Sequence, residues 1–132
     1  MLLTKKSEYA MLALVLIAKT DIPQNADTLS TNLDISKSFL AKILQQLAKN
    51  DILKSFKGIN GGFLLNIEPI DLTILTIIKI AEEKMPSVFE CSNDGQLCSS
   101  SKSSSCTLFP VLANLQFKIN GFLENLTLKD IM

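Results

Sequence analysis

The sequence predicts a mainly α-helical protein with one small β-hairpin and a long C-terminal helix. Three observations lead to this prediction. Apolar residues recur at helical spacing in the first 50 residues, two short β-prone runs then flank a glycine-rich turn, and a long apolar repeat follows residue 107. The chain has 132 residues, of which 47% are hydrophobic, and this is enough for one compact domain with a buried core.

The first 50 residues predict three helices in succession. Residues 7–19 are apolar almost all round, as expected for a helix in the centre of a domain. The loop 20–25 ends this helix, a short helix fits residues 26–33, and Ser36 is a start signal for the next helix. In that third helix the apolar residues Leu40, Ile43, Leu44 and Leu47 share one face, and the polar or basic residues Ser38, Lys42, Gln45 and Lys49 share the opposite face.

A β-hairpin is predicted directly after these helices. Two β-prone runs, residues 52–56 and 63–67, flank a turn that contains three glycines. Three helices followed by a hairpin is the order of a winged helix-turn-helix, in which the second helix of the pair enters the major groove of DNA and the hairpin, or wing, lies along the backbone. Lys57 at the wing tip then contacts a phosphate or the minor groove, or is simply a solvated turn lysine.

Charge is distributed unevenly along a chain whose formal net charge is zero. Residues 1–60 hold eight lysines and five acidic residues, a net charge of +3, and residues 61–132 hold five lysines and eight acidic residues, a net charge of −3. A basic first half permits nucleic-acid binding through part of the surface. Because all thirteen cations are lysines, bidentate recognition of guanine by arginine is excluded.

The only cysteines, Cys91, Cys98 and Cys106, lie in one loop rich in serine, and the chain has no histidine. No apolar run is long enough to span a membrane, so we expect a cytoplasmic protein, in which clustered thiols bind a metal or react rather than form disulfides. Zinc is disfavoured by the wide cysteine spacing, and a thiol redox switch and cysteines without a role remain alternatives. Without histidine or a glycine-rich phosphate loop, we predict no enzymatic activity.

The last third of the chain predicts a long helix with an apolar seam. Its spacing of 4, 3, 4, 3 and 4 residues is typical of a helix that packs along another helix, and Pro110 is tolerated in the first turn. The seam packs on its own domain or on a second copy of the chain. Its members are Leu108, Leu112, Leu115, Ile119, Phe122 and Leu126.

Taken together, four stretches and the cysteines resemble the winged-helix iron–sulfur cluster transcription regulators. This family includes the regulator of iron–sulfur cluster assembly and a nitric-oxide-sensing repressor. The resemblance covers nearly the whole chain, and its order and spacing are more specific than any single motif. The stretches are LTKKSEYA (residues 3–10), ISKSFLAKILQQL (35–47), SFKGINGGFLL (55–65) and LTLKDI (126–131).

The resemblance implies a homodimer that binds a palindromic operator in double-stranded DNA, with no membrane association. It implies a 2Fe–2S or 4Fe–4S cluster on Cys91, Cys98, Cys106 and Glu8. Glu90 and Asp94, which are nearer to the cysteines in sequence, are competitors of Glu8. It also implies a DNA-binding domain over residues 1–84, a cluster-binding loop over 85–106 and a dimerisation segment over 107–132. The implied DNA contacts are Lys6, Ser36, Lys37, Ser38, Lys42, Gln45, Ser55, Lys57 and Gly58.

Several positions depart from the family pattern. Lys57 stands where relatives usually have arginine, and Ala41 stands where the cluster-assembly regulator has glutamate. The cysteines are spaced more widely than in the named relatives, and Phe109 occupies the place of a histidine ligand. The main alternative is therefore a cluster-free regulator of the same fold that is controlled by docking to a partner protein or by thiol oxidation.

Overall fold

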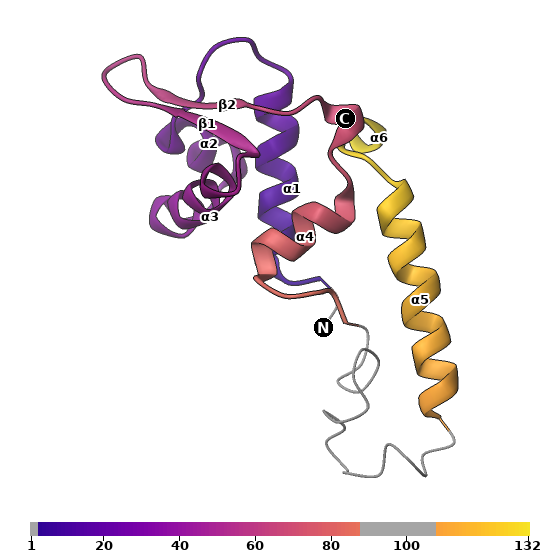
Figure 1. The fold of residues 1–132 in the computed structure, drawn as a ribbon. Coiled ribbons are helices and arrows are strands. Elements are labelled where there is room, and N and C mark those ends of the chain that lie inside the picture. The colour runs from indigo at the N-terminus through magenta and orange to yellow at the C-terminus, as the bar shows by residue number, and fades with distance from the viewer. Residues whose placement is uncertain (1–2, 88–107) are drawn as a thin grey trace.

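The computed structural model describes residues 3–87 and 108–132 (Figure 1). It confirms a mainly helical fold with one two-stranded antiparallel hairpin, in the element order of a winged helix-turn-helix. None of the helices in these two ranges is both long and apolar enough to cross a bilayer. The elements are α1 (Lys5–Ala18), α2 (Ala26–Leu33), α3 (Lys37–Lys49), β1 (Leu53–Phe56), β2 (Gly62–Leu65), a 3-10 turn (Pro69–Asp71), α4 (Ile74–Glu82), α5 (Phe109–Asn125) and α6 (Leu128–Ile131).

Helix α1 lies at the centre of the fold, as its apolar sequence predicts. Its residues Ala10, Ala13, Leu14 and Ile17 are fully buried and belong to the same core as the apolar faces of α3 and α4. The helix begins two residues earlier than the apolar pattern suggested. The reason is a polar first turn, in which the Thr4 hydroxyl accepts a hydrogen bond from the Lys6 amide at 3.2 Å and caps the helix.

Local capping defines the pair α2 and α3, and the predicted boundaries are confirmed. The Asn25 side chain accepts a hydrogen bond from the Thr28 amide at 2.7 Å, and the Ser36 hydroxyl accepts one from the Phe39 amide at 3.4 Å. Between the helices, Asp34 takes a left-handed conformation with φ 55°, which ends α2 and turns the chain within a few residues.

The hairpin pairs Leu53 with Leu65 and Phe56 with Gly62. It is fastened to the loop before α2, because Gln24 and Phe63 exchange two backbone hydrogen bonds of 3.0 and 2.9 Å. This close approach requires glycine at position 62, where φ is 146° and a Cβ atom would lie 2.5 Å from the Gln24 carbonyl carbon. The loop therefore holds the wing in a fixed direction relative to the helices.

Helices α4 and α6 were not assigned from the sequence. Helix α4 buries Ile74, Ile77, Ile78 and Ala81 and lies between α3 and α5 (Figure 1). After α5 the chain returns to the start of α4, where the Ile74 amide donates to the Leu126 carbonyl at 2.8 Å. These contacts fix the C-terminal end of α5 to the core.

A partly buried polar contact joins the start of α1 to the end of α4. The hydroxyls of Ser7 and Thr4 both donate to one oxygen of the Glu82 carboxylate, with Ser7 at 2.6 Å, and Ser7 is fully buried. Partial burial alone would raise the pKa of Glu82, but these hydrogen bonds outweigh it and hold the pKa below its ordinary value. The ionised carboxylate thus stabilises the fold.

We predict that Glu82→Ala lowers the free energy of unfolding by about 1–3 kcal/mol, because it leaves the buried Ser7 hydroxyl without its acceptor. Since the pKa of Glu82 is depressed, its stabilisation is present above the ordinary pKa of glutamate, about 4.3, and is lost as the pH falls through the lower folded value. Urea unfolding at pH 7 and at a pH below the folded pKa of Glu82 measures both effects. Glu83→Gln, a change on the exposed neighbour, is the control and should leave stability unaltered.

Candidate nucleic-acid interface

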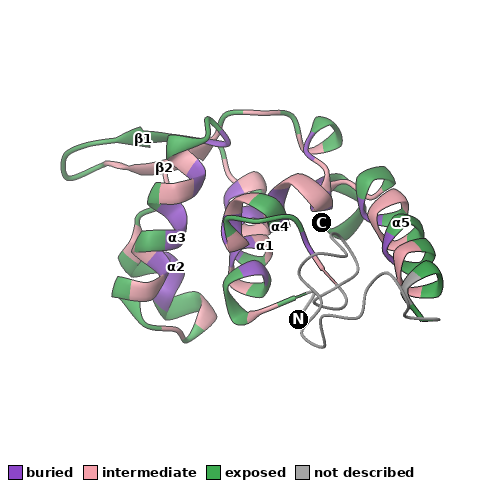
Figure 2. Cartoon of the chain, turned by 60° about the horizontal axis from the view of Figure 1, so that its bottom comes forward, coloured by how far each residue is buried: buried purple, intermediate pink, exposed green. Residues whose placement is uncertain are grey.

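Helix α3 presents one buried face and one exposed face (Figure 2). Its apolar residues Leu40, Ile43, Leu44 and Leu47 are buried in the core, which confirms the predicted orientation. The opposite face is exposed and carries groups that can donate hydrogen bonds or interact with phosphates. The exposed residues on this face are Ser38, Lys42, Gln45 and Lys49.

The first turn of α3 makes contacts of its own. The hydroxyls of Ser36 and Ser38 lie 2.9 Å apart, and Lys37 forms an ion pair of 2.8 Å with Asp27 of α2. Both charged side chains of this pair are exposed to solvent, where such pairs are weak. Lys37 is therefore already partnered within the chain, unlike Lys42 and Lys49, which take part in neither of the two ion pairs found among the described residues.

The hairpin projects beyond the helices on the same side of the molecule as α2 and α3 (Figure 1). The predicted contacts Ser55, Lys57 and Gly58 are exposed along it. Sequence reasoning did not single out Ile59, whose side chain is 99% exposed at the tip. The signal that could have found it is an isoleucine inside a glycine-rich turn, where no core position exists for it.

Lys6, in the first turn of α1, lies beside the exposed polar face of α3. It lines a hollow of about 400 Å³ together with Phe39, Lys42, Gln45 and Lys49. The fold thus brings a residue from the start of the chain next to residues about 40 positions later. The arrangement suits a polyanion, because lysines from two helices lie near neutral hydrogen-bonding groups and outnumber the one carboxylate of the lining, Glu83.

The predicted metal ligands are only partly within the described residues. Cys91, Cys98 and Cys106 lie outside them, and residues 3–87 and 108–132 contain no cluster of three or more potential metal-ligating side chains. Glu8 is exposed in the first turn of α1, where its carboxylate lies 3.0 Å from the Lys5 ammonium. The hydrogen bond from Lys5 to Glu8 and the charge of Glu8 raise the pKa of Lys5.

Helix α5 carries the predicted seam on two adjoining faces. Ile119 and Leu126 pack against the protein's own core, and the buried Gln116 side chain donates to the Pro86 carbonyl at 2.9 Å. Leu108, Leu115 and Phe122 are exposed instead, with Val111 beside them, and Phe122 is 67% exposed. Residues 108, 111, 115 and 122 follow helical spacing and form one exposed apolar strip.

Comparison with known proteins identifies relatives over the whole chain. The family model Rrf2, described as Iron-dependent Transcriptional regulator, matches residues 3–132. The HTH-type transcriptional regulator IscR of Klebsiella pneumoniae (strain 342) is 27% identical over 139 residues, covering 100% of this chain and 80% of the relative.

Solved structures show the same fold. The structure of CymR (YrzC), titled the global cysteine regulator of B. subtilis, has a TM-score of 0.76 at 21% identity and covers 98% of this chain and 94% of its own. IscR of T. potens has a TM-score of 0.74 at 22% identity, covering 98% of this chain and 84% of its own. These findings confirm the resemblance predicted from the sequence, and the chain belongs to the Rrf2 family of transcriptional regulators.

Proposed function

We propose that this regulator is a homodimeric repressor whose affinity for a palindromic operator is controlled by an iron–sulfur cluster that reports redox state, nitric oxide or cluster supply. The observation behind the DNA-binding part is the exposed polar face of α3, set beside a hairpin with a basic tip on the same side of the fold. One protomer presents one such helix, and a two-fold dimer presents two to half-sites about one DNA turn apart.

The cluster is proposed from the chemistry of the available donors. Thiolates are the usual protein ligands of iron–sulfur clusters, and the chain has three, at Cys91, Cys98 and Cys106. We propose Glu8 as the fourth donor, since its carboxylate is exposed and its pairing with the exposed Lys5 is readily broken. The family description, which includes iron dependence, supports the binding of iron but does not bear on which residue is the fourth donor. A bound cluster supplies a centre that reacts with oxidants or nitric oxide.

The proposed division of the chain follows from these roles. Residues 1–84 bind DNA, residues 85–106 hold the cluster, and residues 107–132 form the dimer contact. The first turn of α1, which carries Glu8, lies at the same end of the molecule as the start of α5 (Figure 1). Glu82, hydrogen-bonded to that first turn, ends the helix that leads toward the cysteine segment.

A second candidate keeps DNA binding and replaces the cluster with thiol oxidation or docking to a partner protein. Its motivation is that the fold is shared with solved structures of CymR, one of them titled an oxidized form. Anaerobic treatment of the purified protein with iron and sulfide separates the two candidates. The cluster interpretation requires visible absorption and stoichiometric iron, and the second candidate requires neither.

Two substitutions test the DNA-binding assignment. Gln45→Ala should cost about 1–3 kcal/mol of binding free energy on the preferred operator and little on random DNA, because an amide side chain reads base edges.

Lys57→Ala should weaken binding to all sequences alike and reduce the magnitude of the salt slope by roughly one per phosphate, because fewer counterions are released. Fluorescence anisotropy at several salt concentrations and fixed iron content measures both. Unaltered affinity and slope in both variants would remove α3 and the hairpin from the interface.

A further inference from the structure

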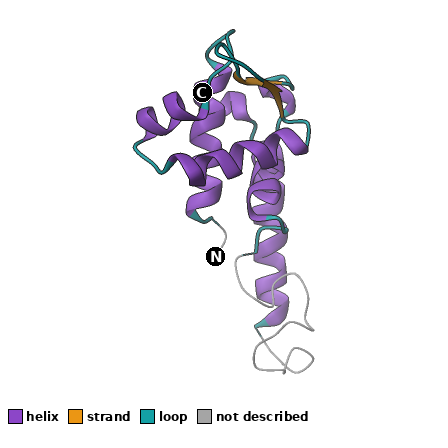
Figure 3. Cartoon of the chain, turned by 90° about the vertical axis from the view of Figure 1, so that its left-hand side faces the viewer, coloured by secondary structure: helices purple, strands orange, loops and turns teal. Residues whose placement is uncertain are grey.

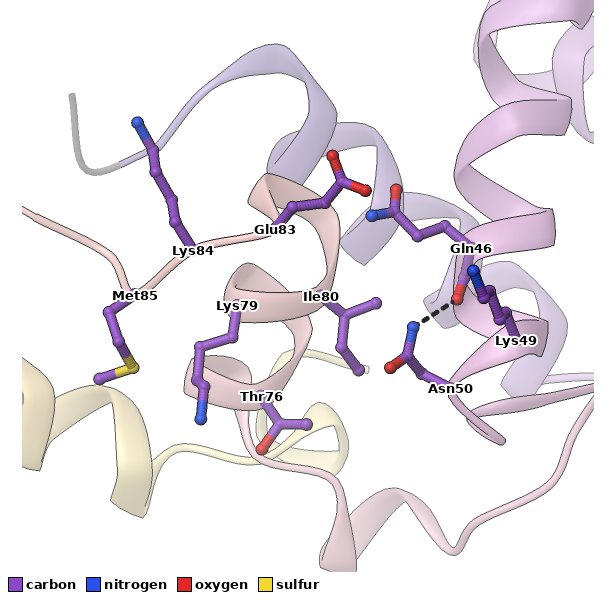
Figure 4. A pocket seen from close by; sticks show the side chains of 9 residues that line it. All are labelled: Gln46, Lys49, Asn50, Thr76, Lys79, Ile80, Glu83, Lys84 and Met85. Carbon is purple, nitrogen blue, oxygen red and sulfur yellow. Dashed lines mark hydrogen bonds between the residues drawn. The ribbon is translucent and has the colours of Figure 1, made fainter.

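A second hollow lies between α3 and α4, on the side of α3 that faces α5 (Figure 4). It measures about 610 Å³ and is lined by three lysines that come from the end of α3, from α4 and from the turn after α4. Neutral groups that can hydrogen-bond to phosphate oxygens stand between them. The lysines are Lys49, Lys79 and Lys84, and the neutral residues are Gln46, Asn50 and Thr76.

This hollow adjoins the first hollow, which Lys6 lines beside the exposed polar face of α3. The two share Gln46, Lys49 and Glu83, and the first hollow adds Lys6 and Lys42. Five lysines therefore line one concave surface that has a single carboxylate. Neither ion pair among the described residues involves any of the five. The lysines repel one another in the free protein, and a bound polyanion would offset this electrostatic repulsion.

The position of the hollow indicates which part of a DNA duplex it meets. Helix α4 lies between α3 and α5 in two views of the molecule, whereas the hairpin extends from the other side of α3 (Figures 1 and 2). Figure 3, a view from the side, shows the strands of the hairpin near the top of the molecule. The hairpin lies on the far side of α3 from α5, so in the proposed dimer joined through α5 the two hairpins would point to the outer ends of the operator. The α3–α4 hollow would then face its centre.

We propose that Lys49, Lys79 and Lys84 form an additional phosphate-binding surface for the centre of the operator, between the half-sites read by the two α3 helices. This inference rests on the proposed function. Lysine suits the role because its ammonium group is a mobile point charge that contacts phosphate without reading sequence. The side-chain amide of Asn50 donates to the backbone carbonyl of Gln46 at 2.8 Å, which holds the Asn50 side chain at the end of α3 beside this surface (Figure 4).

Glu83 reduces the attraction of this surface for phosphate. It ends α4 in a left-handed conformation with φ 60° and lines both hollows, so its negative charge lies among the lysines. Glu83→Gln removes that charge and nearly keeps the shape of the side chain. It should therefore raise operator affinity, in the direction opposite to removal of a lysine.

The test compares two double variants with the same change in net charge. Lys79→Ala/Lys84→Ala removes two lysines of the hollow, and Lys19→Ala/Lys129→Ala removes two exposed lysines that line neither hollow. The first should reduce the magnitude of the salt slope by about 0.9 for each phosphate that is no longer neutralised, and lower affinity at least about tenfold at physiological salt. A dimer carries each substitution in both of its chains, so the change in salt slope is twice that expected for one chain. The second variant should change both quantities little.

Neutral methylphosphonate linkages locate the contact. Placed at the operator centre, they should weaken binding of the unmodified protein and leave binding of Lys79→Ala/Lys84→Ala nearly unchanged. If the unmodified protein prefers no DNA sequence, the proposed function and this inference both fail. If it binds its operator but the two double variants behave alike, or if central methylphosphonates weaken both proteins equally, only this inference fails.

Discussion

Replacing Cys91, Cys98 and Cys106 together with alanine is expected to abolish uptake of iron and sulfide while the protein remains folded and dimeric. The three cysteines lie in a polar, serine-rich segment of the sequence, outside its apolar core pattern. We therefore expect their replacement by alanine to remove the proposed thiolate ligands and to leave the fold intact. Anaerobic reconstitution followed by iron and sulfide analysis, absorption spectroscopy and circular dichroism measures both parts of this prediction.

A matched control keeps the thiols and changes the same segment. Ser99→Ala/Ser101→Ala/Ser104→Ala removes three hydroxyls and should leave cluster content unchanged. Glu8→Ala should keep the cluster but shorten its lifetime in air, since one donor of four is replaced by water. Stoichiometric iron and sulfide in the triple cysteine variant would contradict the ligand assignment. Binding of zinc in place of iron and sulfide by the unmodified protein would favour a zinc site.

Introducing a charge into the exposed strip of α5 is expected to convert the proposed dimer into a monomer. Phe122 is 67% exposed in one chain and shares the strip with Leu115 and Val111, so burial of this strip against a second copy would remove a large apolar area from water. Phe122→Glu should place a charge in that contact. Without the second half-site, operator affinity should then fall by on the order of 100-fold.

Phe117 provides the matched control for this prediction. It lies on a different face of α5 and is 77% exposed, so Phe117→Glu introduces the same charge outside the strip. Sedimentation velocity and operator titration should show a dimer with unchanged affinity. A monomeric Phe117→Glu protein beside a dimeric Phe122→Glu protein would place the interface on another face of the helix.

The sequence alone was sufficient where local chemistry decides the structure. Asn25 and Ser36 cap their helices through hydrogen bonds made within four residues, so the boundaries of α2 and α3 could be read directly. Helix α4 was missed because its run of isoleucine and threonine also suits a strand, and its contacts with α1 and α5 decide the outcome. The four-residue α6 begins with a capping box, in which the Thr127 amide donates to the Asp130 carboxylate at 2.8 Å, a local signal that could have predicted it. Its attachment to the core, through the hydrogen bond from the Leu128 amide to the Leu72 carbonyl, has no such local signal.

The candidate site divides in the same way. The polar face of α3 follows from helical periodicity, and Lys57 follows from the turn that contains it. The second hollow could not be predicted from the sequence. Lys49 and Lys79 are 30 residues apart and line the same hollow only because α4 packs beside α3. The contact of Glu82 with Thr4 and Ser7 joins residues that are still farther apart in sequence, by 78 and 75 positions.

The most direct test of cluster-controlled DNA binding is a paired operator titration. One preparation is divided anaerobically into a cluster-loaded portion and a portion stripped by a chelator, and both are titrated at one salt concentration into a duplex selected by the protein from random DNA. We predict dissociation constants that differ by a factor between about 5 and 150, the usual range of coupling between two sites. Equal dissociation constants in two portions whose iron and sulfide contents differ would contradict the account.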